Sequence, residues 1–172
     1  MNDILKLISE RRSVKGYTDE LPKKEDIDLV IKAGLEAASG RNLQGAIIVA
    51  ITDKVERDRL SAANAAILGA KSDPFYGAPA VLVVLANKAI RTSIYDGSLM
   101  LGNMMLAAHS LGLGSCWIHR ARETFELPEW RQWLLDHGIE GEYEGVGNLV
   151  LGYRSGEYPQ EKPRLPGRVF YI

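Results

Sequence analysis

The sequence predicts one domain in which helices pack on a sheet, an α/β or α+β fold. Three observations predict this class. The chain has 172 residues, which is enough for a single domain with a substantial core. Segments with the spacing of amphipathic helices alternate with short apolar runs that are typical of buried strands. No repeat, low-complexity segment or linker interrupts this alternation, so we expect residues 1–172 to form one layered unit.

Two helices are expected near the amino terminus. Residues 3–10 gather their apolar side chains on one helical face, with Asn2 or Asp3 available as the cap. Residues 27–38 carry apolar or small side chains at the spacing of a buried stripe, and Pro22 lies near the start of this second helix. The segment SGRNLQG that follows is polar and rich in turn formers, so the helix is expected to end before it.

The middle of the chain is expected to hold two strands with a helix between them. Residues 46–52 and residues 77–86 are short, continuous apolar runs, which predict buried strands. Asp53 follows the first run and Glu56 comes three residues later. This spacing is that of a capping box, so it predicts the start of a helix.

The second half continues the alternation. Residues 94–111 are apolar on nearly all sides, so we expect a helix in the middle of the protein that Gly112 ends. The strand SCWI, a surface helix over residues 128–138 and the strand GVGNLVLGY are expected to follow. The last segment, about residues 155–172, contains three prolines and is expected to be extended.

Composition and charge argue against several classes of protein. The net charge is -1, whereas a nucleic-acid-binding protein usually has an excess of basic residues. Cys116 is the single cysteine, so an intramolecular disulfide is impossible and a reducing compartment is expected. The first residues lack the features of a secretory signal, and no apolar run is long enough to span a membrane. We therefore expect a cytoplasmic protein with no nucleic-acid or membrane partner.

The usual signatures of catalysis by side chains are missing from the sequence. The three histidines lie far apart, which gives no support for a metal site. The motifs GxSxG and GxxxxGK[ST] are absent, and the GLG and GVG segments lack the third glycine of a dinucleotide-binding loop. If the protein is an enzyme, we expect a bound cofactor to carry the reactivity.

The segment ISERRSVKGY combines three cations with a hydroxyl at the end of the first helix: Arg11, Arg12, Lys15 and Ser13. Cations at this end of a helix offset the helix dipole, and this is the simpler explanation of the motif taken alone. The alternative is a phosphate site, because arginine makes forked bonds to phosphate and serine adds a donor. Two further cations, Lys162 and Arg164, lie in the tail and could join the same anion.

RRSVKGYTDE resembles the opening motif of the nitroreductase family of FMN-dependent oxidoreductases. The likeness continues in order through EAASGRNLQG, DGSLMLGNMMLAAHSLGLGSCWI, GVGNLVLGY and EKPRLPGRV, so it covers nearly the whole chain. The resemblance implies an α+β fold with a central, mostly antiparallel sheet flanked by helices. It also implies an intertwined homodimer with one FMN at each subunit interface, in which the carboxyl-terminal tail reaches the partner subunit.

The resemblance also implies a set of cofactor-binding residues: Arg11, Arg12, Ser13, Lys15, Ser39, Gly40, Asn42, Asn64, Ile118, His119, Arg120, Lys162 and Arg164. The residues of the opening motif, Arg11, Arg12, Ser13 and Lys15, would approach the flavin phosphate, ribityl chain and ring edge. Lys162 and Arg164 in the tail would close on the phosphate. The three residues of the polar loop would reach the flavin from the other subunit, although serine and asparagine also favour turns without any further role. Asn64 would lie near the ring. Ile118, His119 and Arg120 would lie beside the isoalloxazine. His119 could there either contact the substrate or be a packed structural residue.

The reaction that the resemblance implies is a ping-pong hydride transfer. NAD(P)H would reduce the flavin and leave, and a nitroaromatic, a quinone or a similar small-molecule acceptor would take its place. The flavin carries the electrons, so no acid–base side chain is obligatory, and Lys15 is expected to stabilise the negative charge of the reduced flavin. Gly45 and Ala46 depart from the family pattern, which puts the shape of this loop in question, and the short segment between Asn64 and Pro79 predicts a more open site.

The sequence leaves alternatives of other classes. The same fold could carry other flavin chemistry, such as flavin reduction or reductive dehalogenation. It could also be a non-catalytic FMN-binding module, which would bind flavin without oxidising NAD(P)H. A structural protein that has lost the cofactor is disfavoured, because a lost anion site has no need of the cations Arg11, Lys15 and Arg164.

Overall fold

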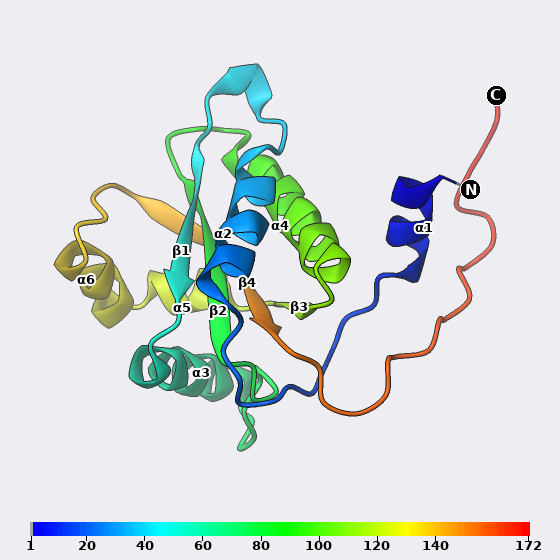
Figure 1. Cartoon of the computed structure of the whole chain (residues 1–172). Helices are drawn as coiled ribbons and strands as arrows, with labels where there is room; N and C mark the ends of the chain where they lie inside the picture. The colour runs from blue at the N-terminus through cyan, green and yellow to red at the C-terminus, as the bar shows by residue number, and fades with distance from the viewer. Residues whose placement is uncertain (1) are drawn as a thin grey trace.

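A computed structural model describes residues 2–172 of the chain (Figure 1). The helices are α1 (Asp3–Glu10), α2 (Lys24–Leu35), α3 (Lys54–Leu68), α4 (Ser93–Ser110), α5 (Ala121–Glu126) and α6 (Pro128–Asp136), with a single 3-10 turn, η1 (Gly40–Asn42). The strands are β1 (Ala46–Ile51), β2 (Ala80–Asn87), β3 (Gly114–Ile118) and β4 (Tyr143–Gly152). No helix in residues 2–172 combines the length and the apolar character that crossing a membrane requires.

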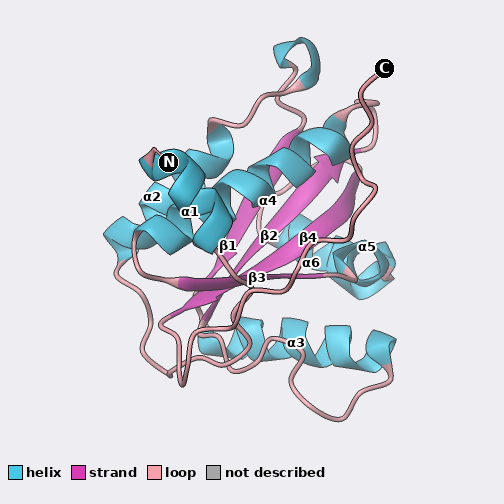
Figure 2. Cartoon of the chain, turned by 90° about the vertical axis from the view of Figure 1, so that its right-hand side faces the viewer, coloured by secondary structure: helices cyan, strands magenta, loops and turns pink. Residues whose placement is uncertain are grey.

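The four strands form one antiparallel sheet in the order β1-β2-β4-β3. The two central strands pair from Ala80 opposite Leu151 to Asn87 opposite Tyr143. Helices cover both faces of this sheet (Figures 1 and 2). The predicted α+β class with a central antiparallel sheet is therefore confirmed.

Each face of the sheet has its own hydrophobic core. One core joins the sheet to α3, α5 and α6 and contains Phe125 and Trp130. The other joins the sheet to α2 and α4 and contains Leu101 and Met104. β2 contributes alternate side chains to the two cores and is buried at every position except its last. This double burial explains why its sequence is apolar throughout instead of alternating with polar residues.

Three details differ from the sequence-based expectations. β1 was expected to be a buried strand, but it lies at the edge of the sheet, and only its two end residues are buried. The second helix ends at Leu35, which is 62% exposed, so the buried stripe does not continue to residue 38. α5 was not expected, because its six residues, ARETFE, are too few to show a helical period.

The helix ends follow the expected local chemistry. The side chain of Asn2 accepts a 2.9 Å hydrogen bond from the backbone N–H of Leu5 at the start of α1. Asp53 likewise accepts a 3.0 Å bond from the N–H of Glu56 at the start of α3. The carboxylate of Glu56 does not complete the capping box, because it accepts a bond from the indole of Trp133 instead.

The glycines of the GVG segment are needed for close packing. A Cβ atom at Gly145 would lie 2.2 Å from the carbonyl carbon of Ala121, and one at Gly147 would lie 2.1 Å from the indole nitrogen of Trp117. These glycines therefore let β4 approach the start of α5 and the side chain of its neighbouring strand. Their spacing has no connection with a dinucleotide loop.

The segment after α1 runs along the open edge of β3 and the end of β4. The N–H of Val14 donates to the carbonyl of Ser115 at 3.0 Å, and the N–H of Thr18 donates to the carbonyl of Tyr153 at 2.9 Å. These bonds fix the basic motif of residues 11–15 against the sheet. The tail, residues 155–172, contains no helix or strand, as its prolines predicted.

Candidate functional site

The two basic groups from opposite ends of the chain meet at one cavity of about 370 Å³. We call it the cationic cavity, and its lining residues are Arg11, Arg12, Ser13, Lys15, Pro159, Gln160, Lys162 and Arg164. All six sequence-predicted residues of the opening motif and the tail line it. The spacing of the sequence could not show that these groups meet, and the structure brings them together.

The charges of this cavity are poorly balanced within the chain. Among residues 2–172, no carboxylate lies within 4.0 Å of the charged nitrogens of Arg11, Lys15, Lys162 or Arg164. The Nη1 atom of Arg11 is buried and has no hydrogen-bond partner in the chain. Burying such a donor without a partner is unfavourable, and gathering like charges adds repulsion. Both costs are offset by an anion with several acceptor oxygens, such as a phosphate group.

Arg12 differs from the other cations of the cavity. Its guanidinium donates to the carbonyl oxygens of Ser9 at 2.6 Å and Arg11 at 2.9 Å. It also forms a 3.3 Å ion pair with Glu161 in the tail. These contacts fasten the end of α1 to the tail. The predicted role of Arg12 at the cofactor stays a prediction, and its structural role is visible here.

A second cluster forms where β3 ends. The side-chain amide of Asn64 donates to the carbonyl of His119 at 2.9 Å and accepts from Nε of Arg120 at 3.0 Å. Asn148 on β4 donates to the same carbonyl at 3.5 Å, and its Oδ1 has no partner. Both asparagines are fully buried. The predicted residues Asn64, His119 and Arg120 therefore lie together.

The local backbone explains why two buried amides are used at this point. Arg120 has a φ of 74°, a left-handed conformation that is unfavourable for a residue with a side chain. The amide contacts to the His119 carbonyl hold the chain in this turn. Ile118 is buried at the end of β3, whereas His119 is exposed. The exposure of His119 favours a contact role over a packed structural role.

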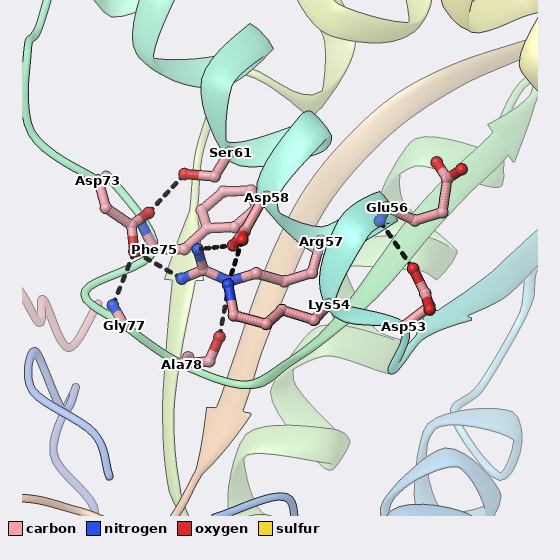
Figure 3. A network of polar contacts seen from close by, with 10 residues as sticks. All are labelled: Asp53, Lys54, Glu56, Arg57, Asp58, Ser61, Asp73, Phe75, Gly77 and Ala78. Atoms are coloured by element: carbon pink, nitrogen blue, oxygen red, sulfur yellow. Dashed lines mark hydrogen bonds and ion pairs between the residues drawn. The ribbon is translucent and has the colours of Figure 1, made fainter. Parts of the chain in front are cut away.

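Tyr76 lies beside Lys15, in the short segment between α3 and β2. The Nζ atom of Lys15 is 5.7 Å from the centroid of the Tyr76 ring, within the range of a cation–π contact. Tyr76 itself has a φ of 57°, so the surrounding chain must hold it in place. A network of polar contacts around Arg57 and Asp73 does this (Figure 3).

In that network Arg57 has a partner for each of its nitrogens. Its Nε donates to the carbonyl of Ala78 at 2.8 Å, its Nη1 donates to Asp58 at 3.0 Å, and its Nη2 donates to Asp73 at 2.6 Å (Figure 3). The carboxylate of Asp73 also accepts from Ser61 and from the N–H groups of Phe75 and Gly77. Burial alone would raise the pKa of Asp73, but these hydrogen bonds outweigh it and hold the pKa below its usual value of 3.8.

Cys116 lies on β3 close to the basic motif and is buried. Burial raises the pKa of its thiol, and this effect exceeds the opposing influence of Ser13 and Lys15. A thiol with a raised pKa is a poor nucleophile. Cys116 is therefore a packed core residue.

The third predicted group, Ser39, Gly40 and Asn42, lies elsewhere in the chain. The hydroxyl of Ser39 accepts from the N–H of Gln44 at 3.2 Å, and the N–H of Gly40 donates to Asp96 at 3.1 Å. This loop packs at the first turn of α4, whereas the tail contacts the last turn of the same helix through Tyr158 and His109. None of the three residues lines the cationic cavity of its own chain.

The family follows from a comparison with known proteins. A profile described as the nitroreductase family matches residues 8–153, which is most of the chain. The chain belongs to the nitroreductase family. The resemblance of the opening motif is thus confirmed, and with it the enzyme class, an NAD(P)H-dependent flavin oxidoreductase of the nitroreductase family.

Curated relatives and a solved structure agree with this membership. The nitroreductase-family chain is 26% identical to the NAD(P)H-dependent FMN reductase of Bacillus subtilis, over 96% of this chain and 71% of that protein. It is 30% identical to the NADPH-flavin oxidoreductase of Vibrio harveyi, over 98% of this chain and 72% of the relative. A crystal structure of a nitroreductase with bound FMN from Bacteroides fragilis covers 100% of both chains, with a TM-score of 0.91 and 26% identity.

Several residues of the site escaped the sequence-based reasoning. Asn148 could have been found, because it is the one amide inside the apolar strand sequence GVGNLVLGY. Tyr76 carries no comparable signal, since its place beside Lys15 depends on the network that joins Asp73 to Arg57 on α3. Gln160 and Pro159 line the cavity only because the tail folds back onto the amino-terminal motif.

Proposed function

We propose that this nitroreductase-family enzyme binds FMN with the phosphate in the cationic cavity and uses NAD(P)H to reduce a nitroaromatic, a quinone or a similar acceptor. The observation that carries the proposal is the buried Nη1 of Arg11, which has no partner in the chain and lies among the cations of this cavity. Arg11, Lys162 and Arg164 supply the donors for a phosphate, and Ser13 adds a hydroxyl. Similar proteins whose structures contain FMN support the choice of this ligand.

Bound FMN would supply the two-electron chemistry, taking hydride from NAD(P)H and delivering electrons to the acceptor. The chain's own residues bind, orient and stabilise charge. Lys15 places a positive charge at the edge of the cavity next to Tyr76, where it stabilises negative charge on a reduced ring. Asn64 and Asn148 hold the turn at His119 and Arg120, which fixes the backbone that faces the ring.

Among the described residues, the segment that joins α3 to β2 contains no helix or strand. The segment between α3 and β2 holds only residues 69–79, and Tyr76 is its one large aromatic side chain at the Lys15 edge. A short segment of this kind favours an open site that can bind electron acceptors of several shapes. Free flavin is a second candidate acceptor, because two of the similar proteins from Bacillus subtilis are named FMN reductases. An acceptor panel that contains a nitroaromatic, a quinone and free FMN separates these candidates.

The site is completed by a second copy of the chain. α1 has no buried residue, and its apolar side chains Ile4, Leu5 and Ile8 are exposed. The end of the tail, Val169 to Ile172, is also exposed and apolar. Such surfaces are normally covered. In a homodimer they would be covered by the partner, and the loop of Ser39, Gly40 and Asn42 would reach the cavity of the other subunit.

The function is tested by the visible absorption spectrum of the purified protein, before and after anaerobic addition of NADH or NADPH. We expect an oxidised flavin spectrum that bleaches on addition of the nicotinamide. A flavin spectrum that stays oxidised with both nucleotides would instead support a non-catalytic FMN-binding module. A colourless protein that takes up no added FMN would contradict the proposed ligand of the cationic cavity.

The dimer is tested by light scattering at micromolar protein concentration. We expect twice the mass of the 19.0 kDa chain. A monomer that retains FMN would show that Ser39, Gly40 and Asn42 are not needed at the cofactor. It would also leave the apolar face of α1 without its proposed partner.

A further inference from the structure

Tyr158 fastens the tail to the carboxyl-terminal ends of two helices. Its hydroxyl accepts a 2.7 Å hydrogen bond from the backbone N–H of Arg12, directly after α1. The same oxygen lies 3.1 Å from the carbonyl of Glu10 and 3.3 Å from Nδ1 of His109, near the end of α4. One hydroxyl group thus links three segments that are far apart in the sequence.

The ring of Tyr158 is held as well as its hydroxyl. It stacks on the imidazole of His109, with 5.8 Å between the ring centroids and 17° between the planes. The guanidinium of Arg154 lies 5.6 Å from the ring centroid. The ion pair between Arg12 and Glu161 adds a second fastening three residues further along the tail. These contacts are numerous for a tyrosine that is 36% exposed.

The contacts of Tyr158 shorten the free segment of the tail that precedes Lys162. The last backbone hydrogen bond that holds the tail runs from the N–H of Ser155 to the carbonyl of Gly16, at 3.0 Å. From Ser155 to Lys162 there are seven residues, but from Tyr158 to Lys162 there are only four. A shorter tether raises the effective concentration of a group at its target. Anchoring Tyr158 therefore concentrates Lys162 and Arg164 at the cationic cavity.

We propose that Tyr158 is a positioning residue, a latch that holds the tail so that Lys162 and Arg164 close on the anion in the cationic cavity. The latch touches neither the proposed phosphate donors nor the proposed ring site, and Tyr158 does not line the cavity. Its effect on cofactor affinity rests on the proposed function, because FMN is the ligand in question. The effect of the latch on how tightly the tail is held does not depend on the proposed function.

The first test measures FMN binding in Tyr158→Phe, which removes the hydroxyl and keeps the ring. We expect the dissociation constant for FMN to rise about fivefold, the value of one net hydrogen bond. In a Lys162→Ala/Arg164→Ala background the same change should have no further effect, because the latch acts through these two cations. An equal loss in both backgrounds would overturn the proposal. Tyr171→Phe is the matched control, since Tyr171 lies in the same tail and is 98% exposed.

The second test needs no cofactor. Trypsin can cut the tail after Arg164, and the rate in FMN-free protein reports how tightly the tail is held. We expect Tyr158→Phe to be cut about fivefold faster than the wild type, with an unchanged melting temperature. Glu161→Gln should act in the same direction through the loss of its ion pair with Arg12. An unchanged rate in Tyr158→Phe would overturn the latch, whether or not the wild type binds FMN.

Discussion

Two arginines of this protein, Arg57 and Arg11, are partly or fully buried but have opposite surroundings. The side chain of Arg57 is 8% exposed, and its nitrogens donate to Ala78, Asp58 and Asp73. Arg11 has a buried Nη1 with no partner, and the other charged residues that line the cationic cavity are all cations. One guanidinium is neutralised within its own chain, and the other is not.

The difference shows how to separate a structural arginine from a binding one. Donors that are satisfied by the chain stabilise the fold, and removing them leaves buried acceptors without partners. Donors that the chain leaves unsatisfied lower its stability and raise its affinity for an anion. The number of basic residues in a motif does not distinguish these cases. The hydrogen-bond partners of each guanidinium do.

The largest effect is expected from Arg57→Met. The substitution removes every hydrogen bond of the guanidinium and leaves the carboxylate of Asp73 without its cation, so the free energy of unfolding should fall by about 3 kcal/mol. Urea unfolding of the FMN-free protein measures this loss. A loss below about 1 kcal/mol, typical of an exposed pair, would show that the network in Figure 3 does not stabilise the fold.

Arg11→Ala should weaken FMN binding without destabilising the fold. We expect the dissociation constant for FMN to rise about thirtyfold, because a charge-assisted bond to the phosphate is lost. The free energy of unfolding of the FMN-free protein should not fall, and it should rise slightly because the substitution removes a buried donor that has no partner. Fluorescence titration with FMN measures the first quantity and urea unfolding the second. The control is Arg131→Ala, which removes an exposed arginine of α6.

A mutant that retains its FMN after dialysis would rule out the phosphate role of Arg11. Equal losses of stability in Arg11→Ala and Arg57→Met would remove the distinction between the two arginines altogether.

The dependence of stability on acidic pH gives a further test of the ion pair between Arg57 and Asp73. The folded pKa of Asp73 lies below its unfolded value of 3.8, so its ionised form stabilises the fold above that value. This contribution is lost as the pH falls through the folded pKa. Asp73→Asn should therefore be less stable than the wild type at neutral pH, and the difference should disappear as the pH falls below 3.8 and through the folded pKa of Asp73. Thermal melts across this range would contradict the prediction if the difference were independent of pH.

The smallest effect is expected at Lys15, which is exposed and for which we propose a contact with the ring instead of the phosphate. Lys15→Met should lower the reduction potential of the bound flavin by about 20 mV and slow its reduction, since an exposed charge contributes less than about 1 kcal/mol. Lys15→Arg keeps the charge and should restore the potential. A potential that is the same in Lys15→Met and the wild type would remove the electrostatic role of this residue.

The sequence predicts most of the fold because burial leaves a local pattern. β2 is buried on both faces and reads as a continuous apolar run, and α4 reads as a helix that is apolar on nearly all sides. The edge position of β1 has no such pattern, because its apolar run resembles that of a central strand. The sequence also does not predict the early end of α2, for a related reason. Leu35 continues the apolar spacing although it faces outward.

The site is less predictable because its contacts join distant parts of the chain. The basic motif was found through its own residues, and its convergence with Lys162 and Arg164 was only a possibility until the cavity brought them together. The link between Tyr158 and Arg12 spans 146 residues, and no local pattern marks either end. The loop at Ser39 and Gly40 does not line the cationic cavity of its own chain, and its expected place in a partner's site remains a prediction.

The junction of the two chain ends has a consequence for biosynthesis. Residues 11–15 leave the ribosome early, but the cavity that they line also needs residues 159–164. At usual rates of translation the first group must wait roughly 10 to 30 s for the second. For most of that time Ser115 and Tyr153, the residues of β3 and of the end of β4 that hold the same segment, have not yet been synthesised. The cationic cavity therefore cannot form, and a nascent chain cannot bind a ligand there, before residues 159–164 have been synthesised.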